Sequence, residues 1–282
     1  MIRRWHLAVL ALLGVFALAC EGAGGATPGP SGSAGAKKYP SSMAALGDSI
    51  TVGFGSCGSY VACERNSWST GTADAVDSHY RRILAKNPKI KGRAHNYARP
   101  GAEADDLADQ AARAVDAKVE YVTVLIGAND ACAPSPAGMT SVAAFRTEVD
   151  DALARLKAGL PKAAVLVASV PDLYRLWQLG RRDERVVAVW NRLGVCPSMF
   201  AGPTSTAPAD DERRRAVRDR INDYNDQLRQ ACRGYGKRCR WDGGRVHEAR
   251  YNLDLVNHND YFHPNAAGQR ELAEVTYSGR FA

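Results

Sequence analysis

A serine near the start of the chain has neighbours that suit a nucleophile. Ser49 follows Gly47 and Asp48 at the end of a short apolar run, where a tight turn would present its hydroxyl. A serine hydroxyl is a weak nucleophile until a base removes its proton, so Ser49 needs an imidazole and a carboxylate that orients it. The alternative is that Ser49 only caps the helix that follows.

His263 is the histidine best placed to act as that base. The segment "NDYFHPN" puts Asp260 three residues before His263, within reach on a turn, just before the last predicted helix. The other histidines receive no catalytic role: we expect an exposed His79 on a helix, a structural His95 within a strand, His6 in an N-terminal leader, and His247 and His258 in polar loops.

Acyl transfer also requires rigid hydrogen-bond donors aimed at the oxyanion. Asn129 in "GAND" directly follows the most apolar run, and Gly101 follows an earlier one at a predicted turn. The backbone N–H of Ser49 would be a third donor. Each has an alternative role, with Asn129 and Ser49 as helix caps and Gly101 as a turn residue.

The elements that must position these residues alternate between strand and helix patterns, which predicts an α/β fold with a mainly parallel sheet. Parallel sheets bind ligands at the carboxyl ends of their strands, where all these residues fall. One domain is expected over residues 40–282. The predicted strands are 43–46, 92–98, 120–127, 163–170 and 239–242, and the predicted helices are about 67–86, 103–117, 141–159, 210–231 and 265–276.

Four blocks in this order, over about residues 44–275, resemble those of the SGNH (GDSL-type) esterases and lipases. The blocks are Gly47-Asp48-Ser49, Gly101, Gly127-x-Asn129-Asp130 and Asp260-x-x-His263. The resemblance implies a three-layer α/β/α flavodoxin-like fold with a five-stranded sheet, no metal and no organic cofactor. It implies Ser49 as nucleophile, His263 as base, Asp260 as its orienting carboxylate, and Ser49, Gly101 and Asn129 as the oxyanion hole.

Three residues next to Ser49 have expected roles in the turn or differ from the family's motif. Gly47 is expected to permit the tight turn and Asp48 to support it. Ile50 stands where the family's name motif has leucine, which lies beyond the nucleophile.

The N-terminus predicts export. Residues 1–19 read as a signal peptide with Arg3 and Arg4 before an apolar run, and residues 20–39 read as a flexible Gly/Ala/Pro/Ser tether. Cys20 directly follows "ALA", which fits either a lipoprotein with an acylated Cys20 or an ordinary cleavage site. The protein is therefore expected to be a cell-surface lipoprotein or a secreted protein, and the lipid would be its contact with the membrane.

Six further cysteines in an exported chain predict three disulfides. Cys57 with Cys63 and Cys232 with Cys239 are favoured as local clips, which leaves Cys132 with Cys196 across a long loop. A zinc site is the alternative, but no CxxC or paired Cys/His spacing occurs. The cysteines, the Ala- and Arg-rich sequence and the tether resemble the three-disulfide actinobacterial branch of the family.

Charge gives no sign of a nucleic-acid partner. The formal charge of +7 becomes +5 without Arg3 and Arg4, and the basic runs 181–185 and 213–220 are interleaved with acids on predicted helices. A solvated face explains these runs, because export and disulfides argue against nucleic acid. We expect a monomer.

Substrate choice rests on two apolar groups. The first group, Phe54, Tyr60 and Trp68, follows the nucleophile and is expected to form a pocket wall. The second group lies in the 172–208 stretch and either forms an acyl-binding wall or lid or only covers the sheet edge. Its members are Tyr174, Leu176, Trp177, Leu179, Trp190, Leu193, Met199 and Phe200. Three functions follow: a carboxylester hydrolase for acyl or lipid esters, a carbohydrate esterase that deacetylates glycans, or a non-catalytic surface lipoprotein that binds a ligand.

Overall fold

The computed structural model describes residues 39–281. The expected signal peptide (1–19) and the tether (20–39, with Cys20) lie outside the described residues, apart from Tyr39.

The described chain contains a five-stranded sheet in the order β2-β1-β3-β4-β5, and all its pairings are parallel. Each strand lies within or beside a predicted run: β1 Met43–Gly47, β2 Ala94–Asn96, β3 Tyr121–Leu125, β4 Ala164–Val167 and β5 Cys239–Trp241. The three central strands are buried on both faces. That explains their continuous apolar sequences, and the expected fold class is confirmed.

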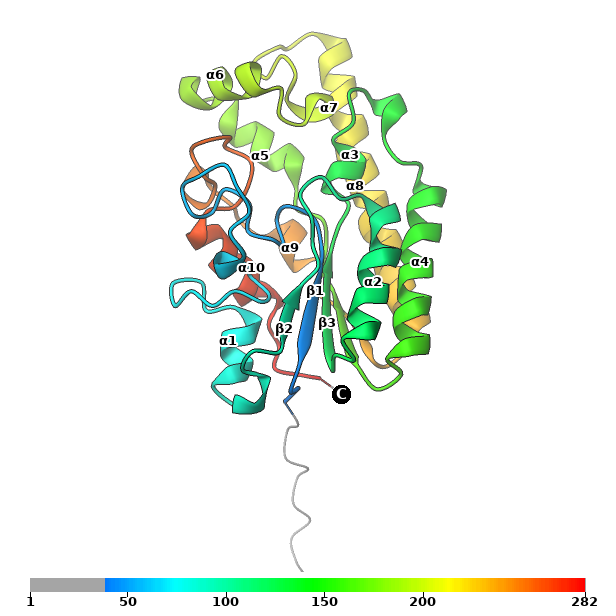
Figure 1. Cartoon of the computed structure of the whole chain (residues 1–282). Coiled ribbons are helices and arrows are strands. Elements are labelled where there is room, and N and C mark those ends of the chain that lie inside the picture. The colour runs from blue at the N-terminus through cyan, green and yellow to red at the C-terminus, as the bar shows by residue number, and fades with distance from the viewer. Residues whose placement is uncertain (1–38, 282) are drawn as a thin grey trace, which may run out of the picture. The chain divides into compact units, whose positions relative to one another are not determined.

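Helices cover both faces of the sheet, which gives the three layers (Figure 1). On one face lie α2 (Leu107–Asp116), α4 (Val142–Gly159) and α8 (Pro208–Tyr235), and on the other lie α1 (His79–Leu84), α9 (Arg245–Glu248) and α10 (Ala266–Thr276). Helix α4 shows the expected helical spacing, because it buries Phe145, Val149, Ala152, Leu153 and Leu156.

The predicted helix over 67–86 is wrong except at its end, where α1 forms. Ser67 shows the reason: its hydroxyl accepts from the N–H groups of Ser69 and Thr70, both at 3.3 Å. Such local side-chain bonds compete with helix formation. The N–H of Trp68 is also taken, since it donates to Gln269 Oε1 at 2.9 Å.

The stretch after β4 forms three helices for which the sequence analysis gave no bounds: α5 (Leu173–Gly180), α6 (Glu184–Leu193) and α7 (Pro197–Phe200). They lie beyond the carboxyl ends of the strands (Figure 1). Trp177, Trp190, Met199 and Phe200 are each at most 3% exposed. These four side chains therefore form the core of this segment and are not an open wall or lid.

His79 is buried, which corrects the expectation that it is exposed. Its side chain is fully buried, and its ring nitrogens bond Tyr121 Oη at 3.0 Å and Thr276 Oγ1 at 2.8 Å. Burial, and then the charges of Arg240 and Arg82, lower the pKa of His79 to about 3. His79 is therefore a neutral structural histidine that ties α1 to β3 and α10.

The three expected disulfides are confirmed: Cys57–Cys63, Cys132–Cys196 and Cys232–Cys239. Disulfides persist in oxidising compartments, so the three bonds fit an exported protein. Within residues 39–281, none of the helices combines the length and the apolar character that a membrane crossing requires.

Candidate active site

The turn after β1 places Ser49 at the carboxyl end of the central strands. Gly47 has φ +144°, and a Cβ there would lie 2.2 Å from the Leu125 carbonyl oxygen on β3, so only glycine fits. Asp48 supports the turn as expected, since its Oδ1 accepts from the Ile50 N–H at 2.8 Å. Ser49 follows with a side chain that is largely buried.

Two buried glutamines that sequence reasoning missed hold this turn. Gln110 on α2 bonds both backbone groups of Gly47, and Gln269 on α10 donates to the Ile50 carbonyl at 2.7 Å while accepting from Trp68 N–H. The sequence contained a sign of their burial, because each glutamine falls in the apolar stripe of its helix. The buried residues of these stripes include Leu107, Gln110, Ala111 and Ala114 on α2, and Gln269, Leu272, Ala273 and Thr276 on α10. A polar residue in such a stripe needs a buried hydrogen-bond partner.

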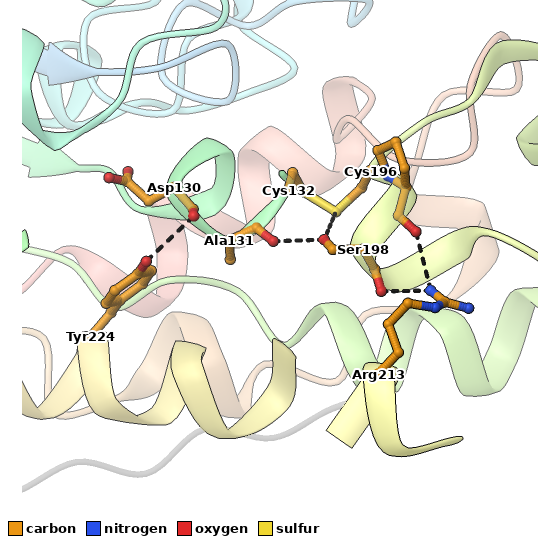
Figure 2. The surroundings of a disulfide bond; sticks show 8 residues. Asp130, Ala131, Cys132, Cys196, Ser198, Arg213 and Tyr224 are labelled. Atoms are coloured by element: carbon orange, nitrogen blue, oxygen red, sulfur yellow. Dashed lines mark hydrogen bonds between the residues drawn. A yellow bond between two sulfur atoms is a disulfide. The ribbon is translucent and has the colours of Figure 1, made fainter. Parts of the chain in front are cut away.

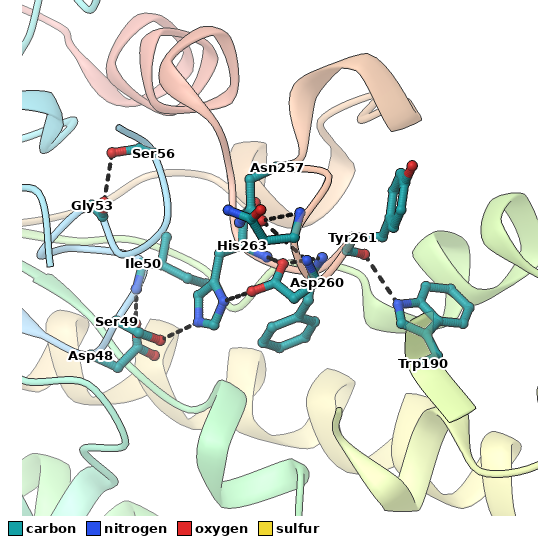
Figure 3. A network of polar contacts seen from close by, with 12 residues as sticks. Asp48, Ser49, Ile50, Gly53, Ser56, Trp190, Asn257, Asp260, Tyr261 and His263 are labelled. Carbon is teal, nitrogen blue, oxygen red and sulfur yellow. Dashed lines mark hydrogen bonds and ion pairs between the residues drawn. The ribbon is translucent and has the colours of Figure 1, made fainter. Parts of the chain in front are cut away.

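Ser49, His263 and Asp260 form one hydrogen-bonded line (Figure 3). Ser49 Oγ lies 2.8 Å from His263 Nε2, and His263 Nδ1 lies 2.7 Å from Asp260 Oδ2. The histidine side chain is 11% exposed and the aspartate is fully buried. A buried carboxylate at this distance fixes the Nδ1–H tautomer, which leaves Nε2 free to accept the serine proton.

The loop that carries Asp260 and His263 is held by its own backbone. Asp260 Oδ1 accepts from the N–H groups of Phe262 (2.8 Å) and His263 (3.0 Å), so the carboxylate is oriented before it meets the imidazole. Asn257 spans the same loop, since its N–H and its Nδ2 both donate to the His263 carbonyl, at 2.9 and 3.1 Å. The short Asp-x-x-His spacing therefore folds into a rigid turn.

The buried Asp48 adds negative charge beneath this line. Its side chain is fully buried, and Oδ2 lacks a hydrogen-bond partner in the described chain. Burial is the largest cause that raises the pKa of Asp48 to about 6, although the bond from Ile50 and the charge of His263 both lower it. In the described chain Asp48 makes no hydrogen bond to Ser49 Oγ, so its charge is what connects it to the imidazole.

Asn129 and Gly101 lie on two adjoining loops. Asn129 on α3 (Ala128–Ala131) donates one Nδ2 hydrogen to the Ala102 carbonyl at 2.8 Å, so its amide lies against the residue that follows Gly101. The Gly101 loop also contacts the end of β1, because the Arg99 N–H donates to the Gly47 carbonyl at 3.1 Å. In the described chain the N–H groups of Ser49 and Gly101 donate to no protein acceptor. Both remain available to a ligand.

Asp130, the residue after Asn129, ties the same two loops from below. Its carboxylate oxygens lie 3.2 and 3.3 Å from the Ala104 N–H, and its side chain is 1% exposed. Burial is the main cause that raises the pKa of Asp130 to about 7, against the opposing bond from Ala104. The block around Asn129 therefore also contributes the buried, readily protonated carboxyl of Asp130, for which the sequence analysis predicted no role.

Only part of the apolar group expected after the nucleophile reaches the site. The Phe54 ring lies 5.0 Å from the His263 ring and 4.8 Å from that of Tyr60, which is 54% exposed. The expectation that Trp68 forms part of the pocket wall is wrong, because Trp68 is fully buried and its Nε1 donates to Thr51 Oγ1 at 3.3 Å.

A small apolar cavity adjoins the residues that flank Ser49 and His263. Its volume is about 40 Å³. Its lining includes Ile50 beside Ser49, Phe262 and Pro264 on either side of His263, and Leu173 and Leu176 of α5. Leu176 is thus the member of the 172–208 apolar group that borders an open space next to the site.

Comparisons with known proteins agree with this architecture. A family model described as GDSL-like lipase/acylhydrolase matches residues 45–271. No curated protein sequence matches the chain. Among solved structures, a mutant acetyl-xylooligosaccharide esterase from Geobacillus is 15% identical with a TM-score of 0.51, covering 83% of this chain and 91% of that one. A catalytic mutant of an acetylxylan esterase from Geobacillus stearothermophilus is 16% identical with a TM-score of 0.50, covering 86% and 96%.

An extracellular lipase from Streptomyces rimosus is 17% identical with a TM-score of 0.43, covering 83% of this chain and 97% of that one. At identities this low, the two esterases with the higher TM-scores establish a shared fold.

Proposed function

Since this chain belongs to the GDSL-like lipase/acylhydrolase family and is a serine ester hydrolase, we propose that Ser49 is its nucleophile, His263 its general base and Asp260 the carboxylate that orients the base. The observation that carries this assignment is the unbroken line from Ser49 Oγ through His263 to Asp260, at 2.8 and 2.7 Å. Three residue types in these positions supply what hydroxyl activation requires.

The reaction proceeds in two halves. Ser49 Oγ attacks the ester carbonyl carbon as its proton passes to His263 Nε2. The C–O bond to the alcohol then breaks, and His263 returns the proton to the leaving alkoxide. Water then attacks the acyl-enzyme and gives a proton to His263. The C–O bond to Ser49 breaks, and His263 returns that proton to Ser49 Oγ, which releases the acid and regenerates the enzyme.

The developing oxyanion needs donors that are free before substrate arrives. The N–H groups of Ser49 and Gly101 and the second Nδ2 hydrogen of Asn129 meet that need. Asn129 is held in place because its other hydrogen is donated to Ala102. These three donors form the proposed oxyanion hole.

For the substrate, we propose carboxylic esters with a short acyl group. The cavity beside Ile50, Phe262 and Leu176 is apolar but holds only about 40 Å³, which suits a few carbon atoms better than a long chain. Three aromatic side chains of the 173–200 segment, Trp177, Trp190 and Phe200, are buried and offer no surface to a longer chain. Acetyl esters of glycans are the second candidate, and the small cavity favours them as well.

Export as a lipid-anchored monomer is proposed from the sequence. Cys20 would carry the lipid and residues 21–39 would serve as its tether, with free secretion after cleavage as the alternative. Mass spectrometry of the mature N-terminus tests this, because an unmodified Cys20 excludes the anchor. Light scattering of the purified protein tests the monomer.

Ser49→Ala assayed on p-nitrophenyl acetate tests the assignment. We expect turnover to fall by at least about 10³, since the nucleophile is absent. Ser56→Ala is the matched control, because Ser56 lies seven residues on and its hydroxyl donates to the Gly53 carbonyl at 2.5 Å, away from the imidazole. A folded Ser49→Ala protein with parental turnover would refute the nucleophile and support the ligand-binding alternative.

A further inference from the structure

We propose that the 173–200 segment, here called the brace, positions the two halves of the catalytic centre relative to each other, and that Trp190 is its positioning residue for the Asp260–His263 loop. The proposal rests on the proposed function of Ser49, His263 and Asn129. The brace comprises α5, α6 and α7. It contacts the loop that carries the base at one end and the helix that carries the oxyanion donor at the other.

The first end reaches the residue between the carboxylate and the base. Trp190 on α6 donates its Nε1–H to the Tyr261 carbonyl at 3.3 Å (Figure 3). Tyr261 has φ +50°, a left-handed conformation that costs a non-glycine residue free energy and that its surroundings must maintain. Trp190 is 1% exposed and lies where it can provide this restraint.

Aromatic packing gives Trp190 a second connection to the same loop. The Trp190 ring stacks on Phe200 at 4.1 Å with an interplanar angle of 15°, and Phe200 meets Phe262 edge-on at 5.9 Å. Phe262 in turn packs against the His263 ring at 4.9 Å. A displaced Trp190 would therefore move both the backbone beside Asp260 and the ring beside His263.

The second end of the brace is covalent. The Cys132–Cys196 disulfide joins the end of α3 to the start of α7 across 64 residues of sequence. Beside it, Ser198 Oγ donates to the Ala131 carbonyl at 2.6 Å (Figure 2). The Ser198 N–H also donates to the Ala133 carbonyl, at 3.1 Å. Helix α3 carries Asn129, so these bonds fix the oxyanion donor to the brace.

Helix α8 supports this second end. Arg213 donates to the carbonyls of Pro197 (3.1 Å) and Ser198 (2.6 Å), and Tyr224 Oη donates to the Asp130 carbonyl at 3.3 Å (Figure 2). The base loop and the donor helix come from segments about 130 residues apart. Catalysis requires their groups to be placed within about 0.5 Å, and the brace is a packed element that contacts both.

Two buried tryptophans of the brace provide a matched pair of variants. Trp190→Phe and Trp177→Phe each remove one indole N–H that donates to a carbonyl, but Trp177 donates to Pro203 at 2.9 Å, outside the catalytic loop. We expect kcat for p-nitrophenyl acetate to fall about tenfold in Trp190→Phe with KM within twofold, because a displaced base weakens the chemical step. Trp177→Phe should keep parental kcat per folded molecule. Equal kcat in the two folded variants would overturn the role of Trp190.

A second pair of variants tests the covalent end. Cys132→Ala/Cys196→Ala should lower kcat, whereas Cys232→Ala/Cys239→Ala, which opens the clip between α8 and β5, should not. Combined with Trp190→Phe, the Cys132/Cys196 change should lower kcat by less than the product of the separate effects, because both act through one element. A combined loss equal to that product would show two independent contacts and would overturn the brace.

Assaying Ser49→Ala in parallel distinguishes a failure of the brace from a failure of the proposed function. Parental turnover in Ser49→Ala sinks the proposed function. If Ser49→Ala is inactive but Trp190→Phe keeps parental turnover, only the positioning role of the brace is overturned.

Discussion

Gln110 brackets Gly47 with a single side-chain amide: its Oε1 accepts from the Gly47 N–H at 2.7 Å, and its Nε2 donates to the Gly47 carbonyl at 3.0 Å. Gln110 is 1% exposed, so water cannot replace either bond. The start of the turn that carries Ser49 is thereby attached to α2. This arrangement allows a strand end with a left-handed glycine to remain fixed two residues before Ser49.

Gln110→Leu should therefore destabilise the protein and weaken catalysis together. The Gly47 N–H would lose its hydrogen-bond partner, whereas the Gly47 carbonyl would keep the bond from the Arg99 N–H. One unsatisfied buried N–H costs about 1–3 kcal/mol in the free energy of unfolding. Urea unfolding and kcat for p-nitrophenyl acetate measure the two effects. Gln178→Leu, at an exposed position on α5, is the control and should change the stability by less than about 0.5 kcal/mol. An unchanged free energy of unfolding in Gln110→Leu would mean that the two Gln110 bonds make no net contribution to stability.

Asn129→Ala should lower kcat by roughly 10² to 10³ while KM changes little, because an oxyanion donor acts mainly on the transition state. Steady-state kinetics on p-nitrophenyl acetate checks both parameters. The control is Asn222→Ala, on the exposed face of α8. A rise in KM with parental kcat would instead make Asn129 a substrate-binding residue.

Asp130 should make stability depend on pH. Burial raises its pKa from the ordinary 3.8 to about 7 in the folded protein, so between these pH values the folded state holds a proton that the unfolded state has lost. Its contribution to stability is full below about pH 4 and declines until the pH passes about 7, by about 4 kcal/mol at most.

Asp130→Asn keeps an acceptor for the Ala104 N–H but cannot titrate. We expect the free energy of unfolding of the variant, measured in urea at pH 4.5, 6 and 8, to increase relative to that of the parent as the pH rises. Asp116→Asn, at the exposed end of α2, controls for the loss of one negative charge. Parallel pH curves for the parent and Asp130→Asn would contradict a protonated Asp130.

Leu176→Ala should shift the acyl-chain preference to longer esters. Removing this side chain enlarges the cavity beside Phe262 and Pro264, so kcat/KM for p-nitrophenyl hexanoate relative to acetate should rise about tenfold. Leu179→Ala is the control, since Leu179 lies on the same helix but does not line the cavity. An unchanged chain-length profile would exclude the cavity as the acyl site, and acetylated xylan assayed alongside would separate glycan esters from simple ones.

The sequence by itself determined the sheet and the order of the site residues. Each strand is a short apolar run with its own turn signal, and parallel strands bring their carboxyl ends to one edge. Ser49 and Asn129 follow central strands, and the Asp260–His263 pair forms its contacts within one short turn. The local disulfides were predictable for the same reason, because Cys57–Cys63 and Cys232–Cys239 close loops of only a few residues.

The tertiary structure alone decided which residues are buried and what restrains the site. His79 lies beside charged neighbours in sequence but is enclosed by Tyr121 and Thr276, from segments 42 and 197 residues away. The same holds for Gln110, which bonds Gly47 across 63 residues, and for Trp190, which reaches Tyr261 across 71. Hydrophobic periodicity describes one element at a time. Burial and hydrogen bonding of these side chains depend on which distant segments pack against them, and that is fixed only when the whole domain assembles.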